Sequence, residues 1–406
     1  MKLNYYQILT IMVLISFSCD DPNSPSDVWD PNDTGNSTPF ISSISPPDSA
    51  YAGSQEITIY GGNFGDNKDS VFVYFNTGSG EVISVDESSI IVMPPNIISD
   101  SVIIKIAAHG AFSFGEYEQN YILHPRILEY GDFDALDESI WGLEADNDEN
   151  LYVGLSIFPE GTIDKITPPL GDREYAFINA VLQTPHSMRI GPDNNIYYVD
   201  AVNPYIVKQD LSSGSPSYAA LPGIAFDLDF DENGNLYCGG SGQSLYRVTT
   251  DLSSTTVADY TDISVRAIRV FNGFVYVGGN YSGTDDTVPS VGVWKNQILS
   301  SDGELGEKEL VLDWGELAGV NSNITGITFD ENSAMYISSD ANVAIGLISA
   351  EGIFSELFPK IISAPISKMT WGSTNYLYLN YRGNPRALYR LDVGLNGAIY
   401  HGRNQR

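Results

Sequence analysis

The sequence is poor in cysteine and in basic residues, and each shortage excludes a class of protein. Only two cysteines, Cys19 and Cys238, occur in 406 residues, which excludes a disulfide-dense scaffold. Lys and Arg total 20 against 52 Asp and Glu, a formal net charge of −32. Such a surface repels phosphate backbones and anionic lipid headgroups, so nucleic acid is excluded as a partner.

Histidine is also scarce, which limits the catalytic chemistry that the chain can perform. There is no H-x-x-x-H or C-x-x-C spacing for a metal, no G-x-S-x-G turn for a serine nucleophile and no phosphate-binding glycine loop. We therefore expect no resident cofactor and a protein that is not an enzyme. The four histidines are His109, His124, His186 and His401.

What the sequence does contain is typical of large β-rich folds. Apolar residues make up 42% and charged residues 18%, enough to bury substantial cores. Tyrosine (25) and glycine (38) are abundant, which favours strands joined by tight turns. The length predicts more than one domain.

The N-terminus has the pattern of an export signal. Residues 1–18 carry one Lys and an apolar core from Ile8 to Phe17, and Cys19 follows. The pattern resembles a bacterial lipoprotein signal, which implies an acylated Cys19; an ordinary secretory signal is the alternative. Residues 19–38 predict a disordered tether. Asp20 and Asp21 resemble a surface-export signal, although in other bacteria Asp there retains a lipoprotein at the inner membrane. We expect an envelope protein, anchored by lipid in the outer membrane and facing outward.

Residues 39–124 predict a β-sandwich of immunoglobulin type. Short alternating strands such as VFVYF (71–75) and SVIIKIAA (101–108) are separated by turns. The opening I-x-x-I-x-P, the G-x-N-F-G at 61–65 and the segment from Ser88 to Pro95 (SSIIVMPP) resemble motifs of the IPT/TIG family. In bacterial surface proteins, such domains often act as spacers.

The remaining residues, 125–406, repeat with a period of about 40 residues. Each repeat has a short strand, a polar turn and an apolar–Tyr pair, with 60 residues between the fourth and fifth pairs and 39 to 45 between the others. Four strands per period predict a six-bladed β-propeller, and the repeats resemble the NHL type. The predicted fold class is therefore all-β, a sandwich followed by a propeller. Either residues 126–130, which we favour, or residues 398–402 supply the outer strand of the sixth blade.

One residue in the first strand of each blade is expected to face the central channel. In the propellers that this region resembles, these first strands line the channel, and alternation selects one residue from each. The expected interpretation is a salt-bridge network that closes the channel, because buried charges persist when paired. The alternative makes this ring the floor of a ligand pocket. The six residues are Glu144, Arg189, Asp229, Arg269, Thr328 and Thr370.

A second group of residues lies nearer the mouth of the channel and is the candidate ligand-binding site. Aromatic and basic side chains there could stack on a sugar ring or bind an anionic group. For Trp141 or Phe226 taken alone, packing between blades is the alternative. The candidates are Trp141, His186, Phe226, Arg266, Asp227 and Lys368.

Two metal-dependent interpretations are weighed against simpler ones. Residues 229–234 match the first half of a calcium-binding EF-hand loop, but its twelfth position is Gly240, so a hairpin turn is favoured and calcium stays a weak alternative. Gluconolactonase-type propellers hold a divalent cation with Glu, Asn and Asp. The corresponding positions here are Trp141, His186 and Phe226, which argues against that chemistry.

Three functions follow from this pattern. The leading hypothesis is a non-catalytic binding or scaffold protein whose propeller mouth binds an extracellular ligand, such as a glycan. A hydrolase or lyase using acidic residues at the mouth is the second, although Asp227 and Asp229 lie too close together on one strand to flank a substrate. The third is a propeller that binds a surface protein partner.

Overall fold

A computed structural model describes residues 34–157, 160–200, 202–242 and 244–403. The predicted signal peptide (1–18), the lipidation site Cys19 and most of the predicted tether lie outside the described residues. Among the residues described, no helix is long and apolar enough to cross a membrane.

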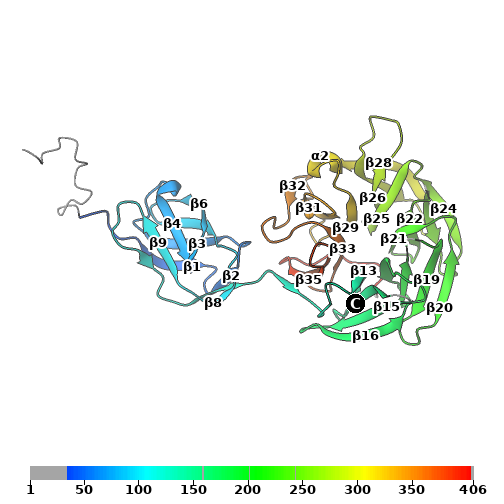
Figure 1. Ribbon diagram of the computed structural model, residues 1–406. Coiled ribbons are helices and arrows are strands. Elements are labelled where there is room, and N and C mark those ends of the chain that lie inside the picture. Colours follow the sequence, from blue (N-terminus) through cyan, green and yellow to red (C-terminus); the bar gives the residue numbers. More distant parts are fainter. Residues whose placement is uncertain (1–33, 158–159, 201, 243, 404–406) are drawn as a thin grey trace, which may run out of the picture. The chain divides into compact units, whose positions relative to one another are not determined.

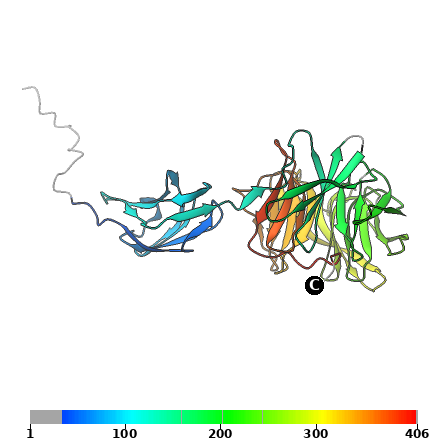
Figure 2. The same cartoon turned by 90° about the horizontal axis from the view of Figure 1, so that it is seen from below.

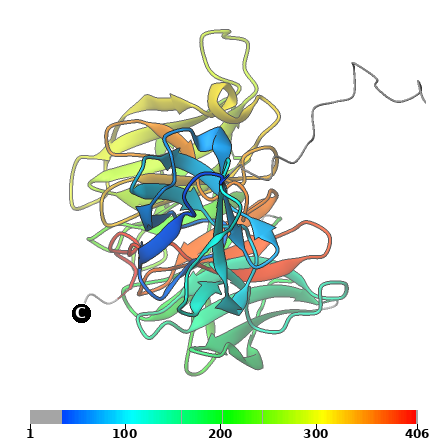
Figure 3. The same ribbon diagram turned by 90° about the vertical axis from the view of Figure 1, so that its left-hand side faces the viewer.

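The chain divides into two compact units. Residues 34–49, 56–95 and 101–122 form the first, and residues 50–55, 96–100 and 123–403 form the second. The N-terminal strands form two four-stranded sheets, of order β1-β3-β7-β6 and β10-β9-β4-β5, and a short sheet of order β2-β11-β8. They are coloured blue to cyan in Figure 1, and Figure 3 shows them from another side. The elements are β1 (Phe40–Ser45), β2 (Ser49–Tyr51), β3 (Ile57–Gly62), the short helix η1 (Lys68–Ser70), β4 (Val71–Phe75), β5 (Gly78–Ser79), β6 (Glu81–Val85), β7 (Ser89–Met93), β8 (Ser99–Val102), β9 (Ile104–Ala108), β10 (Gly115–Glu116) and β11 (Tyr121–His124).

The sandwich is held together by the alternation seen in its sequence. Ile57 and Ile59 on β3 are fully buried, as are Ile104 and Ile106 on β9, while the residues between them lie nearer the surface. This period of two places one face of each sheet in a shared core. The prediction of a β-sandwich is confirmed.

The sandwich begins before the predicted end of the tether. The amide nitrogen of Asn36 donates to the Gly110 carbonyl at 2.7 Å, and Asn36 also forms a β-bridge with Ala111. The prediction that the tether extends to residue 38 is therefore wrong at its end, because backbone pairing ties Asn36 to the sandwich.

The second unit is a propeller of six antiparallel sheets, each of four strands (Figure 1). Figure 2 gives a view of the same sheets turned by 90°. Each innermost strand contacts the innermost strands of the two neighbouring sheets, and β13 contacts β33, so the ring is closed. The fold class predicted from the sequence is confirmed. From inside to outside, the first blade consists of β13 (Ser139–Ala145), β14 (Leu151–Ile157), β15 (Glu160–Thr167) and β16 (Asp172–Asn179), and the second of β17 (Ser187–Ile190), β18 (Asn195–Val199), β19 (Tyr205–Asp210) and β20 (Pro216–Ala220). The third consists of β21 (Ala225–Phe230), β22 (Leu236–Gly240), β23 (Ser244–Val248) and β24 (Ser254–Asp259), and the fourth of β25 (Ile263–Phe271), β26 (Phe274–Tyr281), β27 (Val291–Ile298) and β28 (Leu305–Asp313), which the helix α2 (Trp314–Ala318) follows. The fifth consists of β29 (Ile324–Phe329), β30 (Met335–Ser339), β31 (Ile345–Ile348) and β32 (Phe354–Glu356), and the sixth of β33 (Ile366–Trp371), β34 (Tyr376–Tyr381), β35 (Ala387–Asp392) and β12 (Ile127–Glu129).

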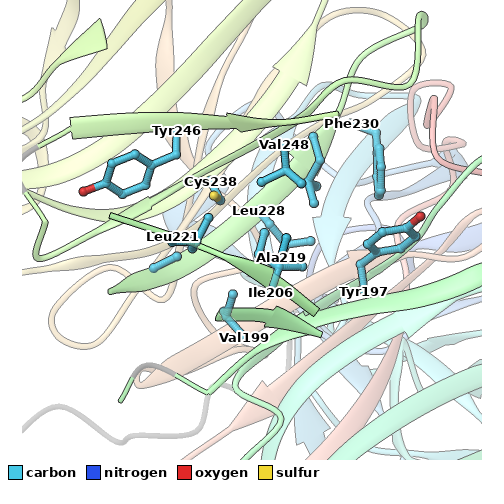
Figure 4. Close-up of a cluster of buried hydrophobic side chains, with 12 residues drawn as sticks. Tyr197, Val199, Ile206, Ala219, Leu221, Leu228, Phe230, Cys238, Tyr246 and Val248 are labelled. Atoms are coloured by element: carbon cyan, nitrogen blue, oxygen red, sulfur yellow. The ribbon is translucent and has the colours of Figure 1, made fainter. Parts of the chain in front are cut away.

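Burial falls from the axis outward. All four residues of β17 are buried, whereas four of the five on the outer strand β20 are exposed. The second and third blades share a cluster of 12 buried side chains (Figure 4), among them Ile206, Leu228 and the free thiol of Cys238. Complete burial raises the pKa of this thiol, as expected of a packing residue rather than a nucleophile.

The recurring polar turn and tyrosine form one structural unit. Asp231 accepts hydrogen bonds from the backbone nitrogens of Asn233 and Asn235, and its second oxygen accepts from the Tyr237 hydroxyl at 3.2 Å. The turn thus supplies a hydrogen-bond acceptor for the hydroxyl of the buried tyrosine on the strand that follows it. Equivalent tyrosine–aspartate hydrogen bonds join Tyr152 to Asp146, Tyr197 to Asp193 and Tyr336 to Asp330.

The sixth blade has Gly372 six residues before its tyrosine, at the position that Asp146, Asp231 and Asp330 occupy in their blades, and the first blade supplies the missing carboxylate. Glu149 accepts from the amide and hydroxyl of Ser373, both at 2.7 Å, and from the Tyr378 hydroxyl at 3.2 Å. A Cβ at position 372 would lie 1.8 Å from a Glu149 oxygen, so glycine makes this contact possible. Glu149 therefore joins the last blade to the first.

The outer strand of the sixth blade comes from the start of the propeller. Ile127 on β12 pairs with Leu391 on β35, and Leu128 pairs with Arg390. The favoured alternative for ring closure is confirmed, and the other, residues 398–402, is wrong. Gly397 instead forms a bridge with Asp330 of the fifth blade, and the chain then continues to a buried Tyr400.

Candidate functional site

Five of the six innermost strands carry a β-bulge at the same level. On β21, Ala225 pairs with Gly240 and Asp227 with Gly239, so Phe226 is an extra residue without a partner. A bulge re-aims a side chain out of the alternation of its strand, and bulges are common beside functional sites. The blade without one, the second, has His186 immediately before its strand. The bulges on the other four strands lie at Trp141–Gly142, Arg266, Thr325 and Ser367.

The bulged residues surround a depression of about 440 Å³ at the mouth of the propeller. Five of the six residues predicted for the mouth line it, and they come from five different blades. Their convergence follows from the closed ring, which brings equivalent positions of all blades to one end of the axis. The lining consists of Trp141, Thr184, His186, Asp200, Val202, Phe226, Arg266, Ile324, Thr325, Ser367, Lys368 and Arg382.

Three aromatic side chains from consecutive blades form an arc around part of the mouth. The ring centroids of Trp141 and His186 are 5.3 Å apart, and those of His186 and Phe226 are 6.4 Å apart. Trp141 and Phe226 are each half-buried, so inter-blade packing covers only part of each ring. Arg382 lies over Trp141, with its Cζ 3.8 Å from the ring centroid, and Arg266 lies over Phe226 at 5.1 Å.

An ion pair across the channel forms the floor of the mouth. Lys368 Nζ on the sixth blade lies 3.6 Å from Asp227 Oδ1 on the third, so the pair joins opposite sides of the ring. Asp227 is 2% exposed and also accepts hydrogen bonds from the Ser187 hydroxyl and the Ile268 amide. Burial opposes ionisation of Asp227, but Lys368 and Arg189 outweigh it and lower its pKa. Burial lowers the pKa of Lys368.

The ring predicted for the channel lies below this floor as a second charged layer. Arg189 stands between two carboxylates, with its Nη1 3.7 Å from Glu144 and its Nε 3.4 Å from Asp229. Arg269 Nη1 lies 3.7 Å from the other oxygen of Asp229. The Thr370 hydroxyl donates to Glu144 at 3.3 Å. All six ring residues, Thr328 included, are buried, so the ring fills the channel instead of forming the floor of the pocket.

The C-terminal segment covers this ring on the side away from the mouth. The Tyr400 ring lies beneath three guanidinium groups, 4.8 Å from the Cζ of Arg269, 5.4 Å from that of Arg403 and 5.9 Å from that of Arg189. Arg403 Nε also lies 3.4 Å from Glu144. Burial raises the pKa of Glu144, and these arginines oppose the shift. The mouth is consequently a pocket with a closed base.

The structure differs from the sequence interpretation at Asp227. It is not among the residues that line the depression, because Lys368 and the Ile268 amide hold its carboxylate below the mouth. Sequence reasoning also missed Arg382, Tyr400 and Arg403. Because basic residues are so few, an Arg just after the strand that contains Tyr378 could have indicated a residue of the mouth. Nothing in the C-terminal sequence marks Tyr400 as a channel residue.

The calcium-like motif serves the hairpin. Asp231 uses both carboxylate oxygens within its own turn, and Asp229 belongs to the channel ring. Across the described residues, no group of three or more His, Cys, Asp or Glu side chains is placed to hold a metal ion.

His186 is expected to stay neutral in the folded protein down to acidic pH. Burial first, and Lys368 second, lower its pKa to about 4 from about 6.5. The unfolded chain binds a proton below pH 6.5 and the native ring does not, so the free energy of unfolding decreases as the pH falls from 6.5 towards 4. Relative to wild type, His186→Gln should gain about 2–3 kcal/mol of stability between pH 7 and pH 4.5. Denaturant unfolding at both pH values measures this change, and a native His186 NMR titration midpoint near 6.5 would contradict it.

Comparisons with known proteins agree with this architecture. Residues 39–121 match the IPT/TIG domain family. The chain carries an IPT/TIG domain. No curated protein is similar enough in sequence to count as a relative.

Solved structures share the fold at low sequence identity. An auxiliary nutrient binding protein from Bacteroides thetaiotaomicron is 13% identical, with a TM-score of 0.51 over 89% of this chain and 98% of that one. A luciferin-regenerating enzyme is 13% identical, with a TM-score of 0.50 over 69% and 99%. A gluconolactonase from Xanthomonas campestris is 13% identical, with a TM-score of 0.47 over 67% and 89%. The first two of these structures, a nutrient binding protein and an enzyme, therefore share the fold and differ in function.

Proposed function

We propose that this is a lipid-anchored bacterial surface protein whose propeller mouth binds an extracellular saccharide without transforming it. The observation that carries the proposal is the set of bulges on five innermost strands, which gathers Trp141, Phe226 and Arg266 around one pocket. Bulges are over-represented beside functional sites, where they re-aim a side chain, so a bulge at the same level in five blades supports a site at this level.

The chemistry of the mouth suits a sugar ring. Half-buried Trp141 and Phe226 offer aromatic surface for stacking, and the hydroxyls of Thr325 and Ser367 lie on the opposite arc. Pockets of this size, with an apolar wall and a few polar groups, are typical of small-molecule sites.

The location is part of the same proposal. An acylated Cys19, a following tether and an IPT/TIG spacer would hold the NHL-like propeller away from the membrane. A protein of the same fold described as an auxiliary nutrient binding protein is compatible with capture of an extracellular nutrient. That structural similarity supports the fold alone, so the ligand is inferred from the residues of the site.

The hydrolase or lyase alternative finds less support in the mouth. Among the described residues, the nearest carboxylates are already engaged: Asp227 accepts from Ser187 and the Ile268 amide. Asp200 accepts from two backbone amides, those of residues 202 and 203. General acid–base catalysis requires a carboxyl group that can reach the substrate.

A thermal-shift screen against neutral and acidic oligosaccharides and divalent cations tests the proposal. A saccharide at one hundred times its Kd should stabilise the propeller by about 2.7 kcal/mol. Trp141→Ala should abolish that shift. Tyr218→Ala, which removes a half-exposed ring from the outer strand β20, should retain it. If no saccharide shifts the transition, a protein partner replaces the glycan hypothesis, and a shift with calcium alone would implicate the acidic turns.

A further inference from the structure

The charge of the mouth is opposite to that of the whole protein. The chain carries a formal net charge of −32 from 20 basic and 52 acidic residues. Three of the basic residues, Arg266, Lys368 and Arg382, nevertheless line one pocket, and Asp200 is the only carboxylate among its described lining residues.

The Asp200 carboxylate is held by its own turn and not by these cations. Its Oδ1 accepts from the amides of Val202 and Asn203 at 2.9 and 2.7 Å, and its Oδ2 accepts from Asn203 Nδ2 at 2.6 Å. It serves its own turn, and no ion pair connects it to Arg266, Lys368 or Arg382 in the described part of the chain.

Each of the two arginines at the mouth contacts an aromatic ring but forms no ion pair within the described chain. Arg382 lies 3.8 Å from the centroid of Trp141 and Arg266 lies 5.1 Å from that of Phe226, so an aromatic ring supports each guanidinium group. Within the described chain, neither has a carboxylate within 4 Å. A guanidinium group stacked on a ring keeps its N–H donors in its own plane, where they suit the paired oxygens of a carboxylate or a sulfate.

The burial of Arg382 and Lys368 also favours the binding of an anion. Partial burial, and then the nearby Arg386, lower the pKa of Arg382. Among the described residues, Asp227 is the one ion-pair partner of Lys368, which lies at the floor of the mouth. An anion in the mouth would offset this excess of positive charge.

We infer that the mouth recognises an acidic saccharide, with Trp141 or Phe226 against the sugar ring and Arg382 and Arg266 on its anionic substituent. This inference rests on the proposed saccharide-binding function and specifies its ligand class. The substituent is a carboxylate, as in a uronic acid, or a sulfate ester, since both present paired oxygens to a guanidinium group.

Calorimetric titration of the full-length protein tests the inference with three probes of equal length. These are a tetragalacturonate, its fully methyl-esterified form, which keeps the sugar rings and removes the charge, and a sulfated galactose tetramer. The acidic probes should bind at least tenfold more tightly than the neutral ester, and their affinity should fall as the salt concentration rises. The tighter of the two acidic probes identifies the substituent.

Arg382→Gln is the diagnostic variant, and Lys295→Gln is its charge-matched control, because Lys295 lies on β27 of the fourth blade and is not among the lining residues. The first should weaken acidic-probe binding about tenfold or more and leave the neutral ester unchanged. The second should bind all probes as wild type does. Melting temperatures confirm that both variants fold.

The outcomes separate this inference from the function on which it rests. Equal binding of acidic and neutral probes that requires Trp141 would overturn the acidic specificity and leave saccharide binding intact. Failure of all three probes to bind would overturn both. Equal loss of acidic-probe affinity in both variants would reduce the effect to general charge and overturn the assigned role of Arg382.

Discussion

Arg189→Ala is expected to lower the free energy of unfolding of the propeller by about 3–5 kcal/mol. The substitution removes the cation that stands between Glu144 and Asp229, and both carboxylates are almost completely buried. A buried ion pair contributes little relative to apolar packing, but two buried carboxylates that lose the arginine between them, and keep only Arg403 and Arg269 as ion-pair partners among the described residues, are costly. Equilibrium unfolding in urea, followed on the propeller transition, measures the loss.

Lys295→Ala provides the matched control for Arg189→Ala. Lys295 Nζ lies 3.6 Å from Glu309, a distance like those in the channel, but the Glu309 side chain is 62% exposed. Exposed pairs contribute about 0–1 kcal/mol, so this variant should resemble wild type. If the two variants lose equal stability, the channel layer is not a buried, mutually dependent network.

Asp227→Ala is expected to cost about 3–5 kcal/mol as well, and Lys368→Met distinctly less. The first leaves the Lys368 ammonium buried without a carboxylate, whereas the second leaves Asp227 with hydrogen bonds from Ser187 and the Ile268 amide. The double variant should therefore be more stable than Asp227→Ala alone. A double-mutant cycle with chemical denaturation measures the coupling, and strictly additive costs would show that the pair does not span the channel.

The cost of Asp227→Ala should also depend on pH in a defined direction. Burial already lowers the pKa of Lys368, and removal of Asp227 lowers it further. The unfolded chain then binds a proton that the folded variant does not, so the variant gains stability as the pH rises towards the unfolded value of about 10.4. The deficit relative to wild type should shrink between pH 7 and pH 9.

The fold could be predicted from the sequence because its periodic signals are local. The polar turn and the apolar–Tyr pair recur because every blade joins its two innermost strands by a hairpin, and in four blades an aspartate such as Asp231 accepts a hydrogen bond from a tyrosine such as Tyr237. The alternation that places Arg189 and Asp229 in the channel is also a local property of single strands.

The rest depends on contacts between distant segments, which periodicity does not encode. The bulge at Phe226 changes the alternation of its strand by one residue, and only the pairing with β22 reveals it. Glu149 supplies the sixth blade with a carboxylate from more than 200 residues away, and Tyr400 reaches the channel through an irregular segment. Arg382 joins the mouth because closure of the ring places the sixth blade beside Trp141.

Tryptophan fluorescence is the most direct test of the claim that the mouth is the binding site. Trp141 lines the pocket, whereas Trp294, Trp314 and Trp371 are at most 3% exposed. Titration with tetragalacturonate should give a saturable change in emission in the wild-type protein, and Trp141→Phe should lose the change while an aromatic ring keeps the mouth filled. A saturable change of equal size in Trp141→Phe would place the ligand elsewhere and contradict the account.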